Sequence, residues 1–318
     1  MKKLMIAAAA TLCAAVGFSE GVESANVVGY MRITLPAGQE YGMYALPFDG
    51  TGESGTISIQ DLFPSPLSSF HGGPNAANAD QIMFWYNGGY KNLYLFSTTA
   101  TSSAALARHG KWINPGTPPD SSWGTGNQPS TLALAGGTSF WIKRYIAAAN
   151  KDGGAAQAAA LPALTVNVSG QVVTKQSGKA GYTITAATAD SPSYTLVAAG
   201  FSGKFIPNPD KVDATKDPID WMKMGCHGGP NAANADQMMF WYSGSYKSLY
   251  LFSTTATSSA ALARHNKWIN PGTVPDSSWG TGNQPSTVQI EPTQGFWYLR
   301  QKGQTTSFEF QIEQPYTL

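Results

Sequence analysis

The hydrophobic and polar positions of this chain predict short β-strands separated by turns. The clearest case is Gln81–Phe96, where two aromatic-rich stretches flank Asn87-Gly88-Gly89. Turn-forming residues between two alternating apolar runs are typical of a β-hairpin. Taking all three residues as the turn pairs Tyr86 with Tyr90. The prediction is a hairpin with one face in a core and one face toward solvent.

This hairpin lies in a block that the chain carries twice. Residues His71–Thr131 recur as His227–Thr287 with only six differences. A repeat of this size predicts two copies of one structural unit. We therefore expect two tandem homologous domains, residues 26–176 and 177–318. Each domain is expected to close with a strand, and these strands are Leu164–Val168 and Phe308–Ile312.

The faces of the hairpin follow from alternation along its strands. With Tyr86 paired to Tyr90, the predicted core face carries Met83, Trp85, Leu93 and Leu95. The opposite face carries Phe84, Tyr86, Tyr90, Asn92 and Tyr94. Asn92 is replaced by Ser248 in the second copy, so we expect this opposite face to be partly wet.

Helical signals are few. One short helix is expected from Ser102 or Ser103 to His109, with a serine cap and an interior of Ala, Leu and Arg. The next residue is Gly110, and its counterpart is Asn266. Glycine and asparagine tolerate the left-handed conformation just past a helix. The stretch Asn114–Pro129 is rich in Pro and Gly and is expected to be a long loop insertion.

Outside the block the two copies share only a skeleton of short matches. Several resemble a domain found in secreted surface proteins of Gram-negative bacteria, with the pattern GW-x-L-I-x-NPF, IDW, W-[ND]-G-x-x-Y and PG-x-GFF[VI]. The matching stretches are Tyr41–Phe48, Trp85–Tyr90, Gly136–Ile142, Leu164–Val168, Tyr194–Phe201, Pro218–Trp221, Trp241–Tyr246 and Gln294–Tyr298. The resemblance implies a β-sandwich-like extracellular module, usually without an assigned activity. The insertion Ser97–Ser130 departs from this pattern.

The N-terminus indicates export. Residues 1–19 are typical of a secretory signal peptide, with Lys2 and Lys3 before an apolar run too short to span a bilayer. No later stretch is long and apolar enough for a transmembrane helix. We therefore expect a secreted, periplasmic or cell-surface protein. Cleavage leaves one cysteine, Cys226, interpreted as a buried apolar residue, with an intermolecular disulfide as the alternative.

Charge narrows the class of partner. Without Lys2 and Lys3 the formal net charge falls from +1 to −1, and no basic stripe is present for nucleic acid. Charged residues make up 12% of the chain, against about 25% in ordinary soluble domains. Such a surface suits contact with uncharged polymers such as glycans, and it offers little charge repulsion against self-association.

Aromatic residues of the repeat are the candidate ligand-binding residues, because aromatic rings beside amides stack on sugar rings. Trp112 and Trp123 lie in or beside the Pro/Gly-rich loop, where packing demand is weaker. The full set is Tyr86, Tyr90, Tyr94, Trp112 and Trp123, with Tyr242, Tyr246, Tyr250, Trp268 and Trp279 in the second copy.

Calcium is the one cofactor that the sequence suggests. The NAANAD segment offers oxygen ligands at short loop spacing. These weak candidates are Asn75, Asn78 and Asp80, with Asn231, Asn234 and Asp236 in the second copy. The spacing matches no established calcium loop, and turn-forming Asx residues explain it as well.

The sequence favours a non-catalytic, bivalent module that binds a glycan or another extracellular polymer through the aromatic residues of each repeat. One alternative is a structural coat, fibre or matrix protein whose low-charge repeats self-associate. A weaker alternative is a polysaccharide-acting hydrolase, for which each block supplies only Asp80 and Asp120, or Asp236 and Asp276 in the second copy. No nucleophile–base arrangement can be named for it.

Overall fold

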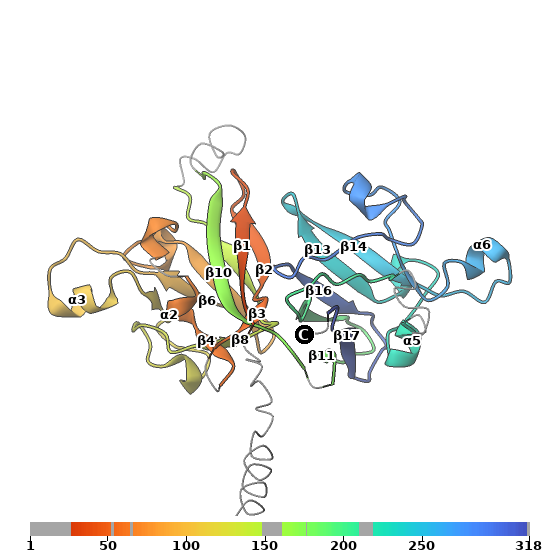
Figure 1. Ribbon diagram of the computed structural model, residues 1–318, viewed down its shortest axis with the longest axis horizontal. Coiled ribbons are helices and arrows are strands. Elements are labelled where there is room, and N and C mark those ends of the chain that lie inside the picture. Colours follow the sequence, from red (N-terminus) through yellow and green to blue (C-terminus); the bar gives the residue numbers. More distant parts are fainter. Residues whose placement is uncertain are drawn as a thin grey trace, which may run out of the picture.

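The computed structural model describes residues 27–51, 54–63, 66–147, 161–175, 177–209 and 219–316. The predicted signal peptide lies outside these residues, as does nearly all of the Ala/Gly-rich stretch before Leu161. Within the described residues no helix is long and apolar enough to cross a membrane. The all-β prediction is confirmed, since antiparallel sheets make up most of both halves (Figure 1).

The first half is built on a five-stranded antiparallel sheet of order β2-β9-β5-β6-β7. Its strands are β2 (Tyr41–Ala45), β9 (Ser139–Lys143), β5 (Gln81–Tyr86), β6 (Gly89–Leu95) and β7 (Trp112–Ile113). Two smaller sheets contain β1 (Val28–Leu35), β10 (Leu164–Val172) and β3 (Phe48–Asp49), and β4 (Thr56–Ser58) with β8 (Ala133–Ala135). The helices are α2 (Ile59–Leu62), α3 (Ser103–Arg108), η1 (Pro66–Ser68), η2 (Ala76–Asn78) and η3 (Ser121–Trp123).

The second half repeats this plan with the sheet order β12-β16-β13-β14-β15. The strands are β12 (Ser193–Ala198), β16 (Gly295–Arg300), β13 (Gln237–Tyr242), β14 (Ser245–Phe252) and β15 (Lys267–Ile269). Strands β11 (Lys179–Ile184) and β17 (Phe308–Glu313) form a separate pair. The helices are α5 (Trp221–Met224), α6 (Ser259–Leu262), η5 (Ala232–Asn234) and η6 (Ser277–Trp279).

Each half has its own hydrophobic core between its large and small sheets. In the first half, Ile33 and Val168 of the small sheet pack with Ile82 and Phe140 of the large sheet. The second core contains Val173 and continues to Ile312. The change of core between Val168 and Val173 lies close to the predicted boundary at residue 176. The finer description of the halves as two sandwiches stays a prediction.

The two large sheets also contact each other through the sides that face away from their cores. A third cluster of buried side chains lies there, formed by Met43, Trp141 and Trp297 with partly buried neighbours. Figure 1 shows the two halves side by side, with α3 and α6 at opposite ends of the molecule and hairpin β13–β14 leaning toward the first half. The repeated helices therefore point away from each other.

The predicted helix and its termination are confirmed. Helix α3 is capped by Ser102, whose side chain accepts from the Ala105 N–H, and Gly110 follows with a φ of 72°. Its counterpart Asn266 has a φ of 57°. Glycine and asparagine are exchanged here because both reach the left-handed region at low cost.

The predicted register of the hairpin is wrong by one residue. The turn contains only Asn87 and Gly88, with φ of 48° and 76°, and Tyr86 pairs with Gly89. Such a two-residue turn is the tight hairpin that Asn-Gly favours. A one-residue slip changes which side chains of the two strands share a face, so the residues of the first strand that lie beside Leu93 and Leu95 are not the predicted ones. The core face therefore carries Ile82, Phe84, Leu93 and Leu95, and the opposite face carries Met83, Trp85 and Tyr90.

Candidate functional site: a tyrosine seam between the halves

Four tryptophans join the two large sheets in a symmetrical arrangement. The ring of Trp85 meets that of Trp297 edge to face, with centroids 5.0 Å apart. The ring of Trp241 meets that of Trp141 in the same way at 5.3 Å. Trp241 is the repeat counterpart of Trp85, and Trp297 is that of Trp141. Each half thus presents the same surface to the other, an isologous contact. We call these surfaces the Trp faces.

Two exposed tyrosines cover the edge of this contact. Tyr90 packs edge-on to Trp85 at 5.1 Å, and Tyr246 packs on Trp241 at the same distance. Each also lies 6.3 Å from the tryptophan of the opposite half, Trp297 for Tyr90 and Trp141 for Tyr246. Tyr90 and Tyr246 remain 43% and 40% exposed. We call this pair, with the rings behind it, the tyrosine seam.

The hydroxyl groups of Tyr90 and Tyr246 form one polar cluster with the Trp297 indole. The Trp297 Nε1–H donates to the Tyr246 hydroxyl at 3.2 Å. Partial burial, followed by the nearby Tyr246 hydroxyl, raises the pKa of Tyr90, so the Tyr90 phenol is neutral at physiological pH. The seam therefore combines rings fixed by edge-to-face contacts with hydroxyls that donate and accept hydrogen bonds. Such a surface suits a ligand with apolar faces and many hydroxyls.

The expectation that the loop tryptophans bind a ligand at the surface is wrong. Trp112 and Trp268 are fully buried, and Trp123 and Trp279 are only 3% exposed. The loop folds back on the core, where Trp123 packs on Phe84 at 5.6 Å. A surface loop with many prolines still supplies core side chains when its backbone returns to the sheet. These four rings cannot stack on a ligand at the surface.

The other predicted tyrosines have separate positions. Tyr94 is 8% exposed and packs in a small cluster with Phe96 and Ile113, and Tyr250 is its counterpart. The Tyr86 hydroxyl donates to Asp120, and Tyr242 donates to Asp276 in the same way. The predicted ligand-binding residues therefore do not form one surface. Tyr86 meets Trp123 within one half, as Tyr242 meets Trp279, whereas Tyr90 and Tyr246 lie together where the two halves meet.

Asp120 serves a local structural role in its loop. Its side chain caps η3 and accepts from the Ser122 N–H at 2.8 Å. Hydrogen bonds from Ser122, and then from Tyr86, lower the pKa of the Asp120 carboxyl. The hydrogen bond between Tyr86 and Asp120 also raises the pKa of Tyr86. Asp276 repeats this arrangement, so neither residue is placed as the proton donor of a hydrolase.

Asp80 and Asp236 anchor their loops to the sheets. Asp80 is fully buried, lies 3.2 Å from Arg144 Nε, and accepts from the backbone N–H of His71 and Tyr145. Burial raises the pKa of Asp80, while these donors and Arg144 oppose the rise. Asp236 is likewise buried, 2.8 Å from Arg300 Nη1. Each NAANAD loop thus has its carboxylate engaged in an ion pair.

The asparagines of these loops add nothing that favours a metal. Asn75 caps η2 by accepting from the Ala77 N–H at 3.0 Å, as a turn-forming Asx residue does. Asn78 and Asn234 end η2 and η5, and Asn231 precedes η5. No group of three or more His, Cys, Asp or Glu side chains within the described residues is arranged to hold a metal ion. Calcium binding by these loops stays a prediction.

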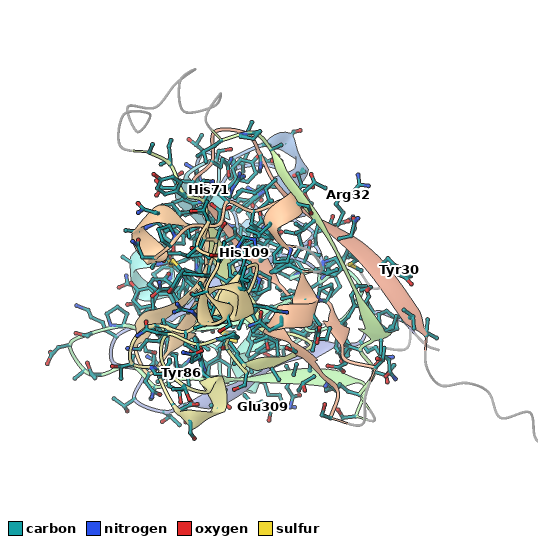
Figure 2. The ribbon with its side chains drawn as sticks, turned by 90° about the vertical axis from the view of Figure 1, so that its left-hand side faces the viewer. Tyr30, Arg32, His71, Tyr86, His109 and Glu309 are labelled. Carbon is teal, nitrogen blue, oxygen red and sulfur yellow. The ribbon has the colours of Figure 1, made fainter. Side chains whose placement is uncertain are left out.

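The histidines of the repeat are not gathered into a site. His71 stacks on Tyr145 with centroids 4.8 Å apart, and His109 Nδ1 accepts from the Thr98 N–H at 3.2 Å. Figure 2 shows His71, His109 and Tyr86 well separated on the end of the first half. Each has a local partner rather than a catalytic neighbour.

Cys226 is buried and free, as interpreted from the sequence. Burial raises the pKa of its thiol. An intermolecular disulfide would require this residue at the surface, so that alternative is wrong for this structure.

Sequence reasoning missed Trp141 and Trp297 as surface-forming residues. In β9, Phe140 points into the core while Trp141 points to the opposite half. Adjacent strand residues face opposite sides, so the Phe-Trp pair that both halves carry is a signal for a strand with two buried faces. No family model, curated protein or solved structure matches this chain.

Proposed function

We propose that the protein is a non-catalytic extracellular binding protein that holds a glycan on the tyrosine seam. The observation that carries this proposal is the meeting of Tyr90 and Tyr246 at the surface, 43% and 40% exposed, over the buried rings of Trp141 and Trp297. Rings that are both exposed and rigid lose little conformational entropy on binding. This distinguishes them from the buried loop tryptophans.

The chemistry of the seam favours an uncharged sugar polymer. Pyranose rings have apolar C–H faces that stack on aromatic rings and hydroxyls that hydrogen-bond to phenols. Tyr194, 42% exposed and 6.3 Å from Trp297, extends the aromatic surface beyond the pair. The low content of charged residues in the chain also favours a neutral ligand over nucleic acid.

The seam is one composite site rather than two separate ones. Each half contributes one tyrosine of the pair, and each tyrosine rests partly on a tryptophan of the other half. The proposed module therefore binds one polymer segment across the contact between the halves. The bivalent arrangement expected from the sequence is replaced by this single site in our proposal.

Extracellular location is part of the proposal and rests on the sequence. The charged and apolar pattern of residues 1–19 supports export through a signal peptide. The resemblance of the strand motifs to secreted surface domains supports the same location.

The test is a pull-down of the chain from Glu20 to Leu318 with insoluble and soluble polysaccharides. A double variant, Tyr90→Ala with Tyr246→Ala, should lose at least about tenfold in affinity, which corresponds to about 1.4 kcal/mol. Tyr90→Phe with Tyr246→Phe keeps the rings and should lose less. Tyr30→Ala is the matched control, because Tyr30 is 78% exposed and lies on β1, which belongs to a small sheet and not to the large sheets that carry the seam. Equal binding by wild type and the double alanine variant would contradict the proposal.

A structural role in a coat or fibre is the second candidate. It is supported by the face-to-face packing of two low-charge repeats through the Trp faces. This reading predicts assembly that increases with protein concentration in sedimentation velocity experiments. A strict monomer at high concentration, together with specific polysaccharide binding, would decide for the first candidate.

A further inference from the structure

The two halves come into close contact at a serine and a glycine in equivalent positions. Ser139 begins β9 and Gly295 begins β16, and the repeat aligns one with the other. A Cβ atom on Gly295 would lie 2.9 Å from Ser139 Oγ, 3.2 Å from Ser139 Cβ and 2.9 Å from the Tyr44 carbonyl oxygen. Gly295 is not among the glycines with positive φ. The close approach, and not the backbone conformation, therefore requires glycine here.

The serine uses the space that the glycine leaves. Ser139 Oγ donates to the Val197 carbonyl oxygen of the opposite half at 2.9 Å. A backbone hydrogen bond, from the Ala45 N–H to the Thr293 carbonyl at 2.8 Å, also joins the halves. The crossing thus fits one serine and one glycine. Two serines would collide, and two glycines would lose the Ser139 hydrogen bond.

The tryptophan ring contacts between the Trp faces are nearly the same in both directions. Trp85 and Trp241 make equivalent contacts in opposite directions, as do Trp141 and Trp297. Because the tryptophan contacts are symmetrical, they do not by themselves distinguish the first half from the second. Discrimination needs an element that penalises the wrong pair. Ser139 and Gly295 supply it.

We propose that each Trp face is a pairing surface selective for the opposite half, and that the first half of one chain binds the second half of another chain as it binds its own. The occupant of the face is thus a second copy of this chain. The argument is continuity with the contact already present: exchange between chains keeps every contact described above and changes only the connection between β10 and β11. This pairing does not depend on glycan binding.

The connection allows a direct experiment on the folded full-length chain. Val173 is held by the second half, since its N–H donates to Ser202 Oγ at 3.3 Å and its carbonyl accepts from the Tyr316 hydroxyl at 2.6 Å. A protease site is therefore inserted between Lys175 and Gly178, after Val173. The chain is cut once folded, and the products are followed by gel filtration and native mass spectrometry.

The cut wild type should remain a one-to-one complex of unlike halves. Mixing two cut samples of different mass label should exchange partners and yield only unlike pairs. Separation of the halves at a protein concentration of about tens of micromolar would overturn the proposal. Abundant pairs of two first halves in the wild type would overturn the selectivity.

Substitutions at the crossing test the selectivity itself. Gly295→Ser should raise the dissociation constant of the cut halves at least about tenfold. Ser139→Gly should permit pairs of two first halves. Combining Ser139→Gly with Gly295→Ser exchanges the two residues and should restore most of the binding. No rescue by the double exchange would contradict a symmetrical crossing.

A matched control separates this effect from general damage. Gly89→Ser introduces the residue that Ser245 already provides in the second copy, and a Cβ at Gly89 meets nothing within 4 Å. It should leave the dissociation constant unchanged. Circular dichroism of each uncut variant reports folding. If Gly295→Ser does not fold, the Ser139→Gly variant and the double exchange still decide the question.

Discussion

The first and second halves reach the same contacts with different residues wherever the near-identical block meets its diverged surroundings. Gln60 Nε2 donates to the carbonyls of Trp112 and Ser130 at 2.8 and 3.0 Å. Asn208 Nδ2 donates to the equivalent carbonyls of Trp268 and Ser286 at 2.7 and 3.0 Å. Asn208 has a shorter side chain than Gln60, and it lies in a different local segment of its half. What is retained between the halves is the hydrogen-bonding requirement of the block and not the residue that meets it.

Core packing shows the same compensation. Phe70 lies against Trp112 at 5.2 Å in the first half, and the equivalent residue is the smaller Cys226. Ile142 of β9 is replaced by the larger Tyr298 of β16, whose ring lies 6.1 Å from Trp268. Cys226 and Tyr298 are both buried in the second core. A small residue at one position therefore accommodates a large one at the other, as close packing requires.

The largest expected effect tests the part that the halves share. Asp80→Ala and Asp236→Ala each leave a buried arginine without its partner, and each should lower the free energy of unfolding by about 3–5 kcal/mol. Asp236→Ala should cost more, because Asp236 also accepts from the Tyr298 hydroxyl at 2.7 Å. Urea unfolding followed by tryptophan fluorescence measures both. Losses below about 1 kcal/mol would show that these ion pairs do not anchor the loops.

The second prediction tests compensation in the cores. Cys226→Phe alone overpacks the second core and should lower the free energy of unfolding by about 1–3 kcal/mol. Adding Tyr298→Ile should recover much of that loss. The reciprocal pair in the first half, Phe70→Cys with Ile142→Tyr, is the matched control. Strictly additive changes in either double-mutant cycle would contradict the coupling.

The third prediction tests the two amides. Gln60→Ala and Asn208→Ala each leave backbone groups of a buried tryptophan without partners, so each should cost about 1–3 kcal/mol. Because Gln60 and Asn208 make equivalent hydrogen bonds, the two losses of unfolding free energy should agree within about 0.5 kcal/mol. Thermal unfolding of the two variants gives the comparison. A large loss for only one of them would show that the halves differ here.

The smallest effect is a difference between the halves at high pH. Burial raises the pKa of Tyr298 well above its ordinary value of about 10, and the first half has Ile142 instead. A phenol with a raised folded pKa contributes stability that is present below pH about 10 and is lost as pH rises further. Tyr298→Phe should therefore reduce the alkaline loss of stability. An identical pH profile for wild type and variant would contradict this assignment.

Local signals explain how much of the fold could be predicted. The alternation of Gln81–Phe96, the serine cap of α3 and the Gly110/Asn266 exchange are properties of neighbouring residues, and the structure has the expected elements. The hairpin register failed because Asn-Gly and Asn-Gly-Gly both read as turns. That single residue decided whether Trp85 or Phe84 enters the core.

The site depended on contacts that no local pattern contains. Trp112 and Trp123 lie in or beside a loop by sequence, but tertiary packing buries them. Tyr90 and Tyr246 were among the candidates, yet nothing in the spacing showed that two copies of one residue meet at a surface. Strands β1 and β11 both contain the dipeptide Gly-Tyr, as Gly29-Tyr30 and Gly181-Tyr182, yet Tyr30 is 78% exposed and Tyr182 packs against the second core. Equivalent letters in diverged strands do not guarantee the same face.

The most direct measurement is the stoichiometry of binding by isothermal titration calorimetry, using an oligosaccharide short enough to occupy one site. The ligand comes from the polysaccharide that the pull-down identifies. The single variants Tyr90→Ala and Tyr246→Ala are titrated beside the wild type. One ligand per chain, with either single substitution weakening the same site, is the result that the tyrosine seam predicts. Two equivalent sites per chain, with each substitution removing only one of them, would contradict a composite site.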